Sequence, residues 1–341
     1  MRRNPPGNAA GLPPANGLYD PVHEHDGCGM GFVAHLRGER SREVVSNALR
    51  LLENLEHRSA VGSDAATSDG SGILLQLPHA FLRTTCAKIH IPLPDAGQYG
   101  VGMFFLPRAH DRAWQLVIER EVEDIARALG CRPLGWRNVP VHERFIGQTA
   151  RRARPRIRQF FVAPGGVDLD VHDADAFERT LYVMRRHIEK AAARLADSNG
   201  EQLYVSSFSS RTIVYKGLVR PSLLASFYPD LADPTVASGL ALVHSRFSTN
   251  TFPTWSRAHP YRFLCHNGEI NTLSGNVEWM RARQARLDDE LLTPVLDEEG
   301  SDSGMLDNAL ELLVRRGRDV RHAVTMLIPP AWQHDSELGA D

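Results

Sequence analysis

Residues of catalytic type gather in four short stretches that lie far apart in the chain. The stretch VHEHDGCGMGF at 22–32 places Cys28 between two glycines, directly before an apolar run. The other stretches are HSRFSTNT with Arg246, CHNGEIN with Asn267 and Gly268, and EEGSDSGMLDN with Asp302. Together they supply a thiol nucleophile, two N–H donors, a guanidinium and a carboxylate. Such a set could attack an amide while it holds the two charged groups of an amino acid.

Three interpretations of Cys28 are open from its own neighbourhood. It could be a buried core cysteine at the start of a strand. It could be a metal ligand together with His23, His25 and Asp26, although no second cluster of matching spacing occurs. It could also be a nucleophile that becomes the first residue of the chain, because a free α-amino group has a pKa of roughly 7.7–8.0 and can serve as its general base.

The distant stretches favour the third interpretation. Asn267 and Gly268 could form a plain turn, but an amide NH2 and an unobstructed backbone N–H also make an oxyanion hole. Arg246 can bind a carboxylate through two parallel hydrogen bonds, and Asp302 can bind an ammonium group. The combination predicts an amino-acid amide as the substrate.

The composition excludes several other classes of protein. The chain has 341 residues, 42% of them hydrophobic and 23% charged, and its net charge of -2 gives no bulk attraction to nucleic acid or to a membrane surface. It contains no apolar run long enough to span a bilayer and no secretory h-region. The four cysteines form no CxxC pair, which indicates a reducing cytoplasm and gives no pattern for a structural metal site.

The hydrophobic pattern predicts strands and helices mixed without a regular βαβ alternation, which indicates an α+β fold. No GxGxxG follows a strand, so a dinucleotide-binding fold is unsupported. Ser41 is the predicted N-cap of the first helix. The predicted strands are 28–36, 70–78, 99–107, 156–164, 238–248 and 261–270, with a hairpin at 202–218. The predicted helices are 41–58, a short one around Phe81, 110–130, 173–196, 273–287, 304–316 and 319–328.

Several remaining features are interpreted as structural. Cys86, Cys131 and Cys265 lie in apolar surroundings and are expected in the core, and Trp255 and Trp279 are expected to pack. The arginine-rich stretch RRARPRIR at 151–158 could bind phosphate, but its position before an apolar strand favours a solvated sheet edge.

The four stretches, with ALRLLENLEHRSAVGSDAATSDGSGILLQLP and the full run HSRFSTNTFPTWSRAHPYRFLCHNGEINTLSGNVEWMRAR, resemble the glutaminase domain of glutamate synthase large subunits. These are class II glutamine amidotransferases of the N-terminal-nucleophile hydrolase fold, a four-layer αββα sandwich. The resemblance implies that residues 1–27, which are poor in large apolar side chains and expected to be disordered, form a propeptide. Residues 28–341 would be the glutaminase domain, truncated at its C-terminus.

The resemblance also implies roles for individual residues. Cys28 would be the nucleophile, Asn267 and Gly268 the oxyanion hole, Arg246 the site for the α-carboxylate and Asp302 the site for the α-amino group. Arg58 would lie in a loop over the glutamine pocket, although it could equally be a helix C-terminal arginine favoured by the helix dipole.

The implied reaction is hydrolysis of L-glutamine to glutamate and ammonia. The ammonia would pass to a synthase domain that converts 2-oxoglutarate to glutamate. No cofactor is expected in this chain; FMN and an iron–sulfur cluster would belong to the synthase domain, and an electron-donating subunit or ferredoxin would be a partner. A free-standing glutaminase subunit that docks on a separate synthase chain, or a catalytically silent interaction module, are the alternatives.

Overall fold

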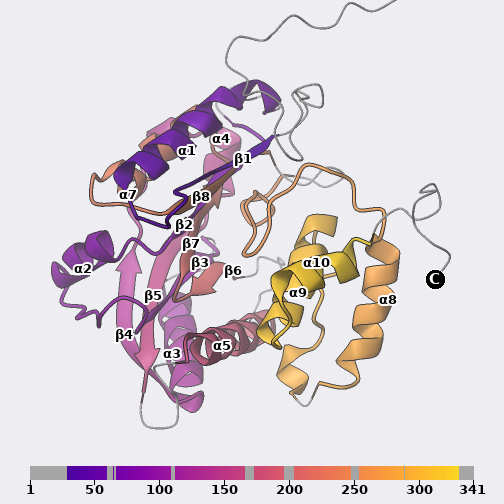
Figure 1. The fold of residues 1–341 in the computed structure, drawn as a ribbon. Coiled ribbons are helices and arrows are strands. Elements are labelled where there is room, and N and C mark those ends of the chain that lie inside the picture. Colours follow the sequence, from indigo (N-terminus) through magenta and orange to yellow (C-terminus); the bar gives the residue numbers. More distant parts are fainter. Residues whose placement is uncertain are drawn as a thin grey trace, which may run out of the picture.

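The computed structural model describes residues 29–59, 64, 67–108, 112–165, 173–195, 203–246, 253–287 and 289–329. Within this part the chain forms two four-stranded sheets in which every pairing is antiparallel. The first sheet has the order β1-β8-β2-β7 and the second the order β4-β5-β3-β6 (Figure 1). The strands of the first are β1 (Met30–Ala34), β8 (Leu240–Ser245), β2 (Ser71–Gln76) and β7 (Thr212–Gly217); those of the second are β4 (Cys131–Asn138), β5 (Arg156–Pro164), β3 (Gly100–Leu106) and β6 (Tyr204–Ser209).

Helices cover both sheets and also form a separate group. Helix α1 packs on β1 and β8, whereas α3 and α5 pack on the second sheet, so the order is helix, sheet, sheet, helix (Figure 1). The predicted α+β fold and its four layers are confirmed. The longer helices are α1 (Arg42–Asn54), α2 (His79–Ala87), α3 (Arg112–Ala128), α5 (Ala174–Leu195), α8 (Leu273–Gln284), α9 (Asp302–Arg315) and α10 (Val320–Leu327). The short ones are α4 (Gln148–Arg152), α6 (Leu224–Phe227), α7 (Pro229–Ala232) and the 3-10 turns η2 (Glu56–Arg58), η3 (Glu143–Phe145), η4 (Pro221–Leu223) and η5 (Glu290–Leu292).

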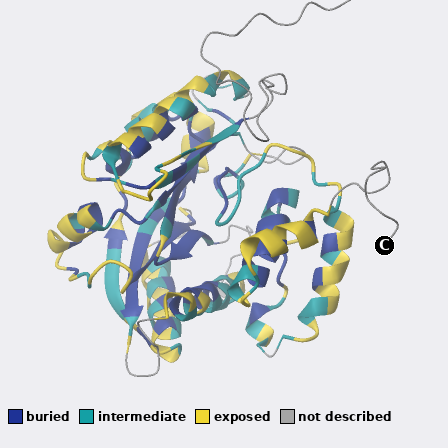
Figure 2. Ribbon diagram, in the orientation of Figure 1, coloured by how far each residue is buried: buried dark blue, intermediate teal, exposed yellow. Residues whose placement is uncertain are grey.

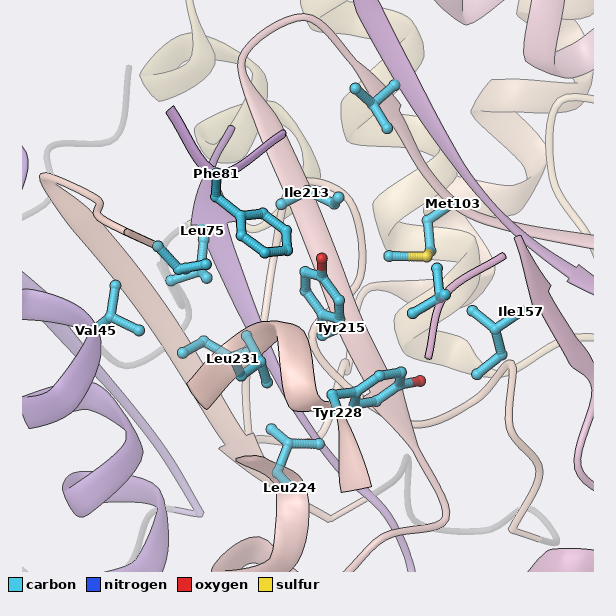
Figure 3. Close-up of a cluster of buried hydrophobic side chains, with 14 of the residues drawn as sticks. Val45, Leu75, Phe81, Met103, Ile157, Ile213, Tyr215, Leu224, Tyr228 and Leu231 are labelled. Atoms are coloured by element: carbon cyan, nitrogen blue, oxygen red, sulfur yellow. The ribbon is translucent and has the colours of Figure 1, made fainter. Parts of the chain in front are cut away.

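Three apolar clusters correspond to these layers. The largest lies between α1, the first sheet and the inner face of the second, and includes Leu75, Met103 and Ile157 (Figure 3). A second cluster joins the outer face of the second sheet to α3 and α5. A third belongs chiefly to α8, α9 and α10. The burial colours follow this division, with the strands largely buried and the outer helices exposed on one side (Figure 2).

Local signals place the first helix correctly. Ser41 caps α1, because its Oγ accepts a hydrogen bond from the Val44 N–H at 3.2 Å. The predicted apolar stripe is buried from Val44 to Leu52. The helix ends at Asn54, and the predicted last turn is instead η2, which carries Arg58.

Three predictions about strands are wrong. The stretch 202–218 is not a hairpin: β6 and β7 follow each other but pair in different sheets. The connecting turn is held by the Glu178 carboxylate of α5, which accepts hydrogen bonds from the Ser209 hydroxyl at 2.9 Å and the Ser210 N–H at 2.5 Å. Residues 261–270 form no strand. Finally, RRARPRIR does not lie on a sheet edge, because β5 is flanked by β4 and β3, and Arg158 pairs with Glu119 of α3.

One strand was missed, and two expectations about packing also fail. Strand β4 contains Pro133 and Gly135, which normally interrupt strands; the sheet accommodates them with a register shift between them. Trp255 is buried as expected, with 4% exposure, but Trp279 is 76% exposed. Cys86 and Cys131 are buried, whereas Cys265 is only half-buried because its segment is not a strand.

Candidate active site

The start of β1 lies beside two of the predicted site residues, Arg246 and Asn267. Cys28 itself lies outside the described residues, but Gly29, the next residue, is buried beside the end of β8. Its carbonyl accepts a hydrogen bond from the Ser245 N–H at 2.7 Å. A Cβ placed on Gly29 would lie 2.8 Å from the Ser245 carbonyl oxygen and 3.2 Å from Asn267 Oδ1. Only glycine fits this gap, and the Asn267 side chain therefore lies against the residue that follows Cys28.

Arg246 reaches the same place because β8 pairs with β1. Met30 is opposite His244, so Arg246 follows directly beyond the strand end, next to Gly29 and Ser245. Its backbone has φ 143, which is rare for a residue with a side chain and marks local strain. The half-buried guanidinium has its Nε 3.9 Å from Asp69 Oδ2. Strained backbone of this kind is found at functional sites more than elsewhere.

The segment that carries Asn267 and Gly268 is held by α9. The Asp307 carboxylate, which is fully buried, accepts hydrogen bonds from the N–H groups of Phe263 at 2.8 Å and of Arg262 and Leu264 at 3.3 Å. These N–H groups are therefore occupied by a side chain, which explains physically why the predicted strand 261–270 does not form.

His266 links the predicted oxyanion hole to the predicted amino-group site. Its Nδ1 lies 3.0 Å from the Gly268 carbonyl oxygen and its Nε2 lies 2.7 Å from Ser303 Oγ. The Ser303 N–H donates to Asp302 Oδ1 at 2.6 Å. Asp302 itself is the first residue of α9, and Ser301 caps that helix by accepting from the Gly304 N–H at 3.1 Å. One histidine thus fixes Gly268 relative to Asp302.

A second histidine, His244, contacts the segment that carries Asn267 and Gly268. Its ring nitrogens lie 3.1 Å from the Arg246 carbonyl oxygen and 2.8 Å from the His266 carbonyl oxygen, so it joins the end of β8 to the Asn267 segment. The ring stacks on that of His259 at 4.4 Å between centroids. Burial lowers the pKa of His244 to about 4, although both carbonyl contacts favour the charged ring.

Arg58 directly precedes a residue that contacts the end of β8. It is the last residue of η2, and the next residue, Ser59, has its Oγ 2.8 Å from Ser245 Oγ. The η2 segment therefore contacts the end of β8, one residue before Arg246. The loop that Arg58 was predicted to enter falls partly outside the described residues.

The described structure thus places Arg246 and Asn267 beside Gly29, the residue after Cys28, and links Gly268 to Asp302 through His266 and Ser303. The sequence interpretation missed the residues that position them, chiefly His244, His266 and Ser303. A signal for two of these was present, because His266 directly precedes Asn267 in HNG and His244 lies two residues before Arg246 in HSR. In the described part of the chain, no three His, Cys, Asp or Glu side chains gather as a metal site. The proposed ligands His23, His25, Asp26 and Cys28 fall outside that part.

Comparison with known proteins identifies the family of this chain. Residues 28–341 match the family of class-II glutamine amidotransferases, and the chain belongs to that family. The family and the class of enzyme predicted from the sequence are confirmed.

The individual relatives are glutamate synthases. The chain is 44% identical over 337 residues to the glutamate synthase [NADPH] large chain of Bacillus subtilis. The aligned region covers 97% of this chain and 21% of that protein. It is 42% identical over 337 residues to the glutamate synthase [NADH] of Saccharomyces cerevisiae, covering 96% of this chain and 16% of that protein. With ferredoxin-dependent glutamate synthase 2 of Synechocystis the identity is 41% over 326 residues, covering 93% and 20%. The chain therefore spans about a fifth of the length of these relatives.

Proposed function

We propose that this chain is the glutaminase part of a glutamate synthase and hydrolyses L-glutamine to glutamate and ammonia. The observation that supports the proposal is the closeness of the Asn267 side chain to Gly29, the residue that follows Cys28 in the sequence. The start of the family match at Cys28 also supports it.

The proposed reaction begins with Cys28 as the first residue of the mature chain, after removal of residues 1–27. Its α-amino group takes the thiol proton, and the sulfur attacks the side-chain amide carbon of glutamine. The oxygen of that amide gains the negative charge and is held by the Asn267 side chain and the Gly268 N–H. The ammonium group returns its proton to the leaving nitrogen, ammonia departs, and water hydrolyses the thioester to glutamate.

The substrate would be held at its other end. Arg246 would bind the α-carboxylate and Asp302 the α-amino group, with Arg58 close to the carboxylate side. The link through His266 and Ser303 supports this division, because it fixes the distance between the group that binds the ammonium and the group that stabilises the oxyanion. His244 and His266 are proposed as positioning residues.

The wider reaction follows from the relatives. The ammonia would be used by a synthase part that makes glutamate from 2-oxoglutarate, and any FMN or iron–sulfur cluster would belong to that part. The electron donor differs among the relatives, whose names include NADPH, NADH and ferredoxin. We also propose a cytoplasmic location. In the described part, no helix combines the length and apolar character needed to cross a membrane.

The test measures the N-terminus and the activity together. We expect the expressed chain to start at Cys28 by intact mass, and to release glutamate from glutamine. Cys28→Ser should reduce the rate by more than about 10³-fold, because a hydroxyl is a far weaker nucleophile. Cys265→Ser is the matched control, since Cys265 is half-buried in the Asn267 segment and has no proposed chemistry.

Two outcomes would contradict the proposal. A fully active preparation that retains residues 1–27 would exclude the N-terminal nucleophile. A correctly processed chain that releases no glutamate would instead support the silent interaction module. A processed chain that is active only after a separate synthase chain is added would favour the free-standing subunit.

A further inference from the structure

Helices α8, α9 and α10 enclose a pocket that shares no residue with the candidate active site. Its volume is about 740 Å³, which is within the usual range for a small-molecule site. The three helices lie beside one another at one side of the molecule, and their outward faces are exposed (Figures 1 and 2). The pocket is lined by residues of α8, by the C-terminal parts of α9 and α10, and by the residues that directly follow α8 and α9.

The charge in this pocket is of one sign. Four of its lining residues are arginines, Arg283, Arg286, Arg316 and Arg318, and no lining residue is acidic. Among the described residues, no carboxylate forms an ion pair with any of the four. Arg281, only two residues from Arg283, differs: it pairs with Glu278 at 2.7 Å and with Glu298 at 2.5 Å.

Helix C-termini offer a simpler explanation for arginines, because their carbonyl groups carry a partial negative charge. That explanation is insufficient here. The Leu327 carbonyl at the end of α10 accepts from the Thr272 hydroxyl at 2.7 Å and the Asn276 amide at 2.9 Å. The carbonyl of Val314 near the end of α9 accepts from the Gly317 N–H at 2.9 Å. Three helix ends supply roughly half a charge each, against four full positive charges, so an excess remains.

The positive charges of these arginines also repel one another. Burial lowers the pKa of Arg283, and the nearby charges of Arg318, Arg316 and Arg286 lower it further. The neighbouring positive charges thus act unfavourably on the charged form of Arg283, and a bound anion would relieve that repulsion.

The rest of the pocket is apolar. Met280, Leu313 and Leu327 are buried residues of the lining, and Trp279 at the surface is 76% exposed. An exposed indole beside guanidinium groups gives a flat face for an aromatic ring next to donors for phosphate or carboxylate. The lining therefore combines recognition of negative charge with recognition of an apolar body.

We propose that this pocket binds a small organic polyanion, one that joins two or more phosphate or carboxylate groups to an apolar or aromatic body. The arginines contact the anionic groups, and Trp279 contacts the body. This site shares no residue with the proposed glutaminase site, and the proposal does not depend on that reaction.

The test compares four probes by calorimetry at constant ionic strength: ADP, pyrophosphate, citrate and adenosine. We expect ADP to bind most tightly, pyrophosphate or citrate more weakly, and adenosine not measurably. Arg283→Gln and Arg318→Gln should each weaken ADP roughly tenfold or more, the usual effect of losing a charge-assisted hydrogen bond. Trp279→Leu should weaken ADP but leave pyrophosphate unchanged.

Arg281→Gln is the matched control, because it lies on the same helix and its charge is already paired. It should not alter ADP binding. Without ligand, Arg283→Gln should keep or raise the melting temperature, since it removes repulsion. The proposal is overturned if no polyanion binds, if adenosine binds as well as ADP, if Arg281→Gln weakens ADP as much as Arg283→Gln, or if Arg283→Gln lowers the melting temperature of the free protein.

Discussion

Two buried polar clusters lie in the sandwich, and they are built in opposite ways. At one, Arg137 of β4 meets Asp230 of α7 through two hydrogen bonds of 2.7 Å, with both side chains buried. Two neutral side chains complete this cluster. Gln159 accepts a hydrogen bond from Arg137 at 2.7 Å, and the Tyr215 hydroxyl donates one to Asp230 at 3.0 Å. Every charge in it has a partner of opposite sign.

The other cluster lies beside the candidate active site and lacks such pairing. His244, His259 and Lys216 are almost completely buried, and among the described residues no carboxylate forms an ion pair with them. Lys216 donates to the Ser256 carbonyl at 2.8 Å and the Tyr204 hydroxyl at 3.1 Å. Burial lowers the pKa of Lys216 and of His259 well below their usual values.

The difference shows what each cluster does. A fully paired cluster ties the second sheet to α7 and contributes to stability only while both partners remain. A cluster of groups kept neutral by burial holds the strand ends at the site but is sensitive to protonation. The first predictions therefore concern stability at the paired cluster and activity at the candidate site beside the unpaired one.

The largest effect on stability is expected at Arg137–Asp230. Asp230→Ala leaves a buried guanidinium without its carboxylate, which should lower the free energy of unfolding by about 3–5 kcal/mol. Denaturant unfolding of the 341-residue chain measures this. The control is Asp124→Ala, which breaks an exposed pair with Arg127 and should change stability little.

A second control separates the charge from the packing. The double variant Arg137→Met with Asp230→Leu removes both charges and should be much closer to wild type than Asp230→Ala. Equal losses in the single and double variants would contradict the argument that the unpaired charge is the cause.

The next effect concerns catalysis at the candidate active site. Asn267→Ala should lower kcat for glutamine hydrolysis by about 10²–10³-fold and change KM little, because an oxyanion donor acts in the transition state. Since Asn267 is exposed, the free energy of unfolding should stay near wild type. Steady-state kinetics and denaturant unfolding on the same preparation test both statements.

Asp302→Ala provides the contrast for that experiment. It removes a group proposed to bind the α-amino group in the ground state as well as the transition state, so KM should rise. If Asn267→Ala changed only KM, the oxyanion role would be wrong, whereas the role of Asp302 would be unaffected.

The parts of the fold that were predictable are those specified by neighbouring residues. Helix α1, its cap at Ser41 and its buried stripe follow from local periodicity and capping. The strand predicted at 261–270 does not form, because three of its N–H groups donate hydrogen bonds to Asp307, more than 40 residues away. The hairpin predicted at 202–218 does not form, because Glu178 of α5 holds the turn between β6 and β7. Contacts of this range leave no periodic signal.

The same holds at the candidate site. The types and spacing of Arg246, Asn267, Gly268 and Asp302 suggested one chemistry. Antiparallel pairing of β1 with β8 positions Arg246, whereas side-chain contacts position the other three. The positioning role of His266 depends on Ser303, 37 residues along the chain, and that of His244 on a carbonyl 22 residues away. Only the three-dimensional structure reveals such partners.

The smallest predicted effect is a loss of stability with falling pH, which arises at the histidine cluster. The pKa of His244 is about 4 in the folded chain and roughly 6.5 when unfolded, so between these values the unfolded chain binds the additional proton. Stability is therefore complete above the unfolded pKa and is lost as the pH falls toward the folded pKa. Between about pH 7 and pH 5, His244 alone should cost about 2 kcal/mol, a window in which most carboxylates remain ionised.

Denaturant unfolding across that window measures the slope, and imidazole NMR signals assign it. The signals of His244 and His259 should not titrate above about pH 5, because burial keeps both rings neutral. Substituting the exposed His322 by Asn should leave the slope unchanged, which excludes a general effect of histidine content. A signal of His244 that moved with a midpoint near the unfolded value would show that the two carbonyl contacts outweigh burial. In that case His244 would take up a proton near its ordinary pKa, the predicted loss of stability would vanish, and the contrast with Arg137–Asp230 would weaken.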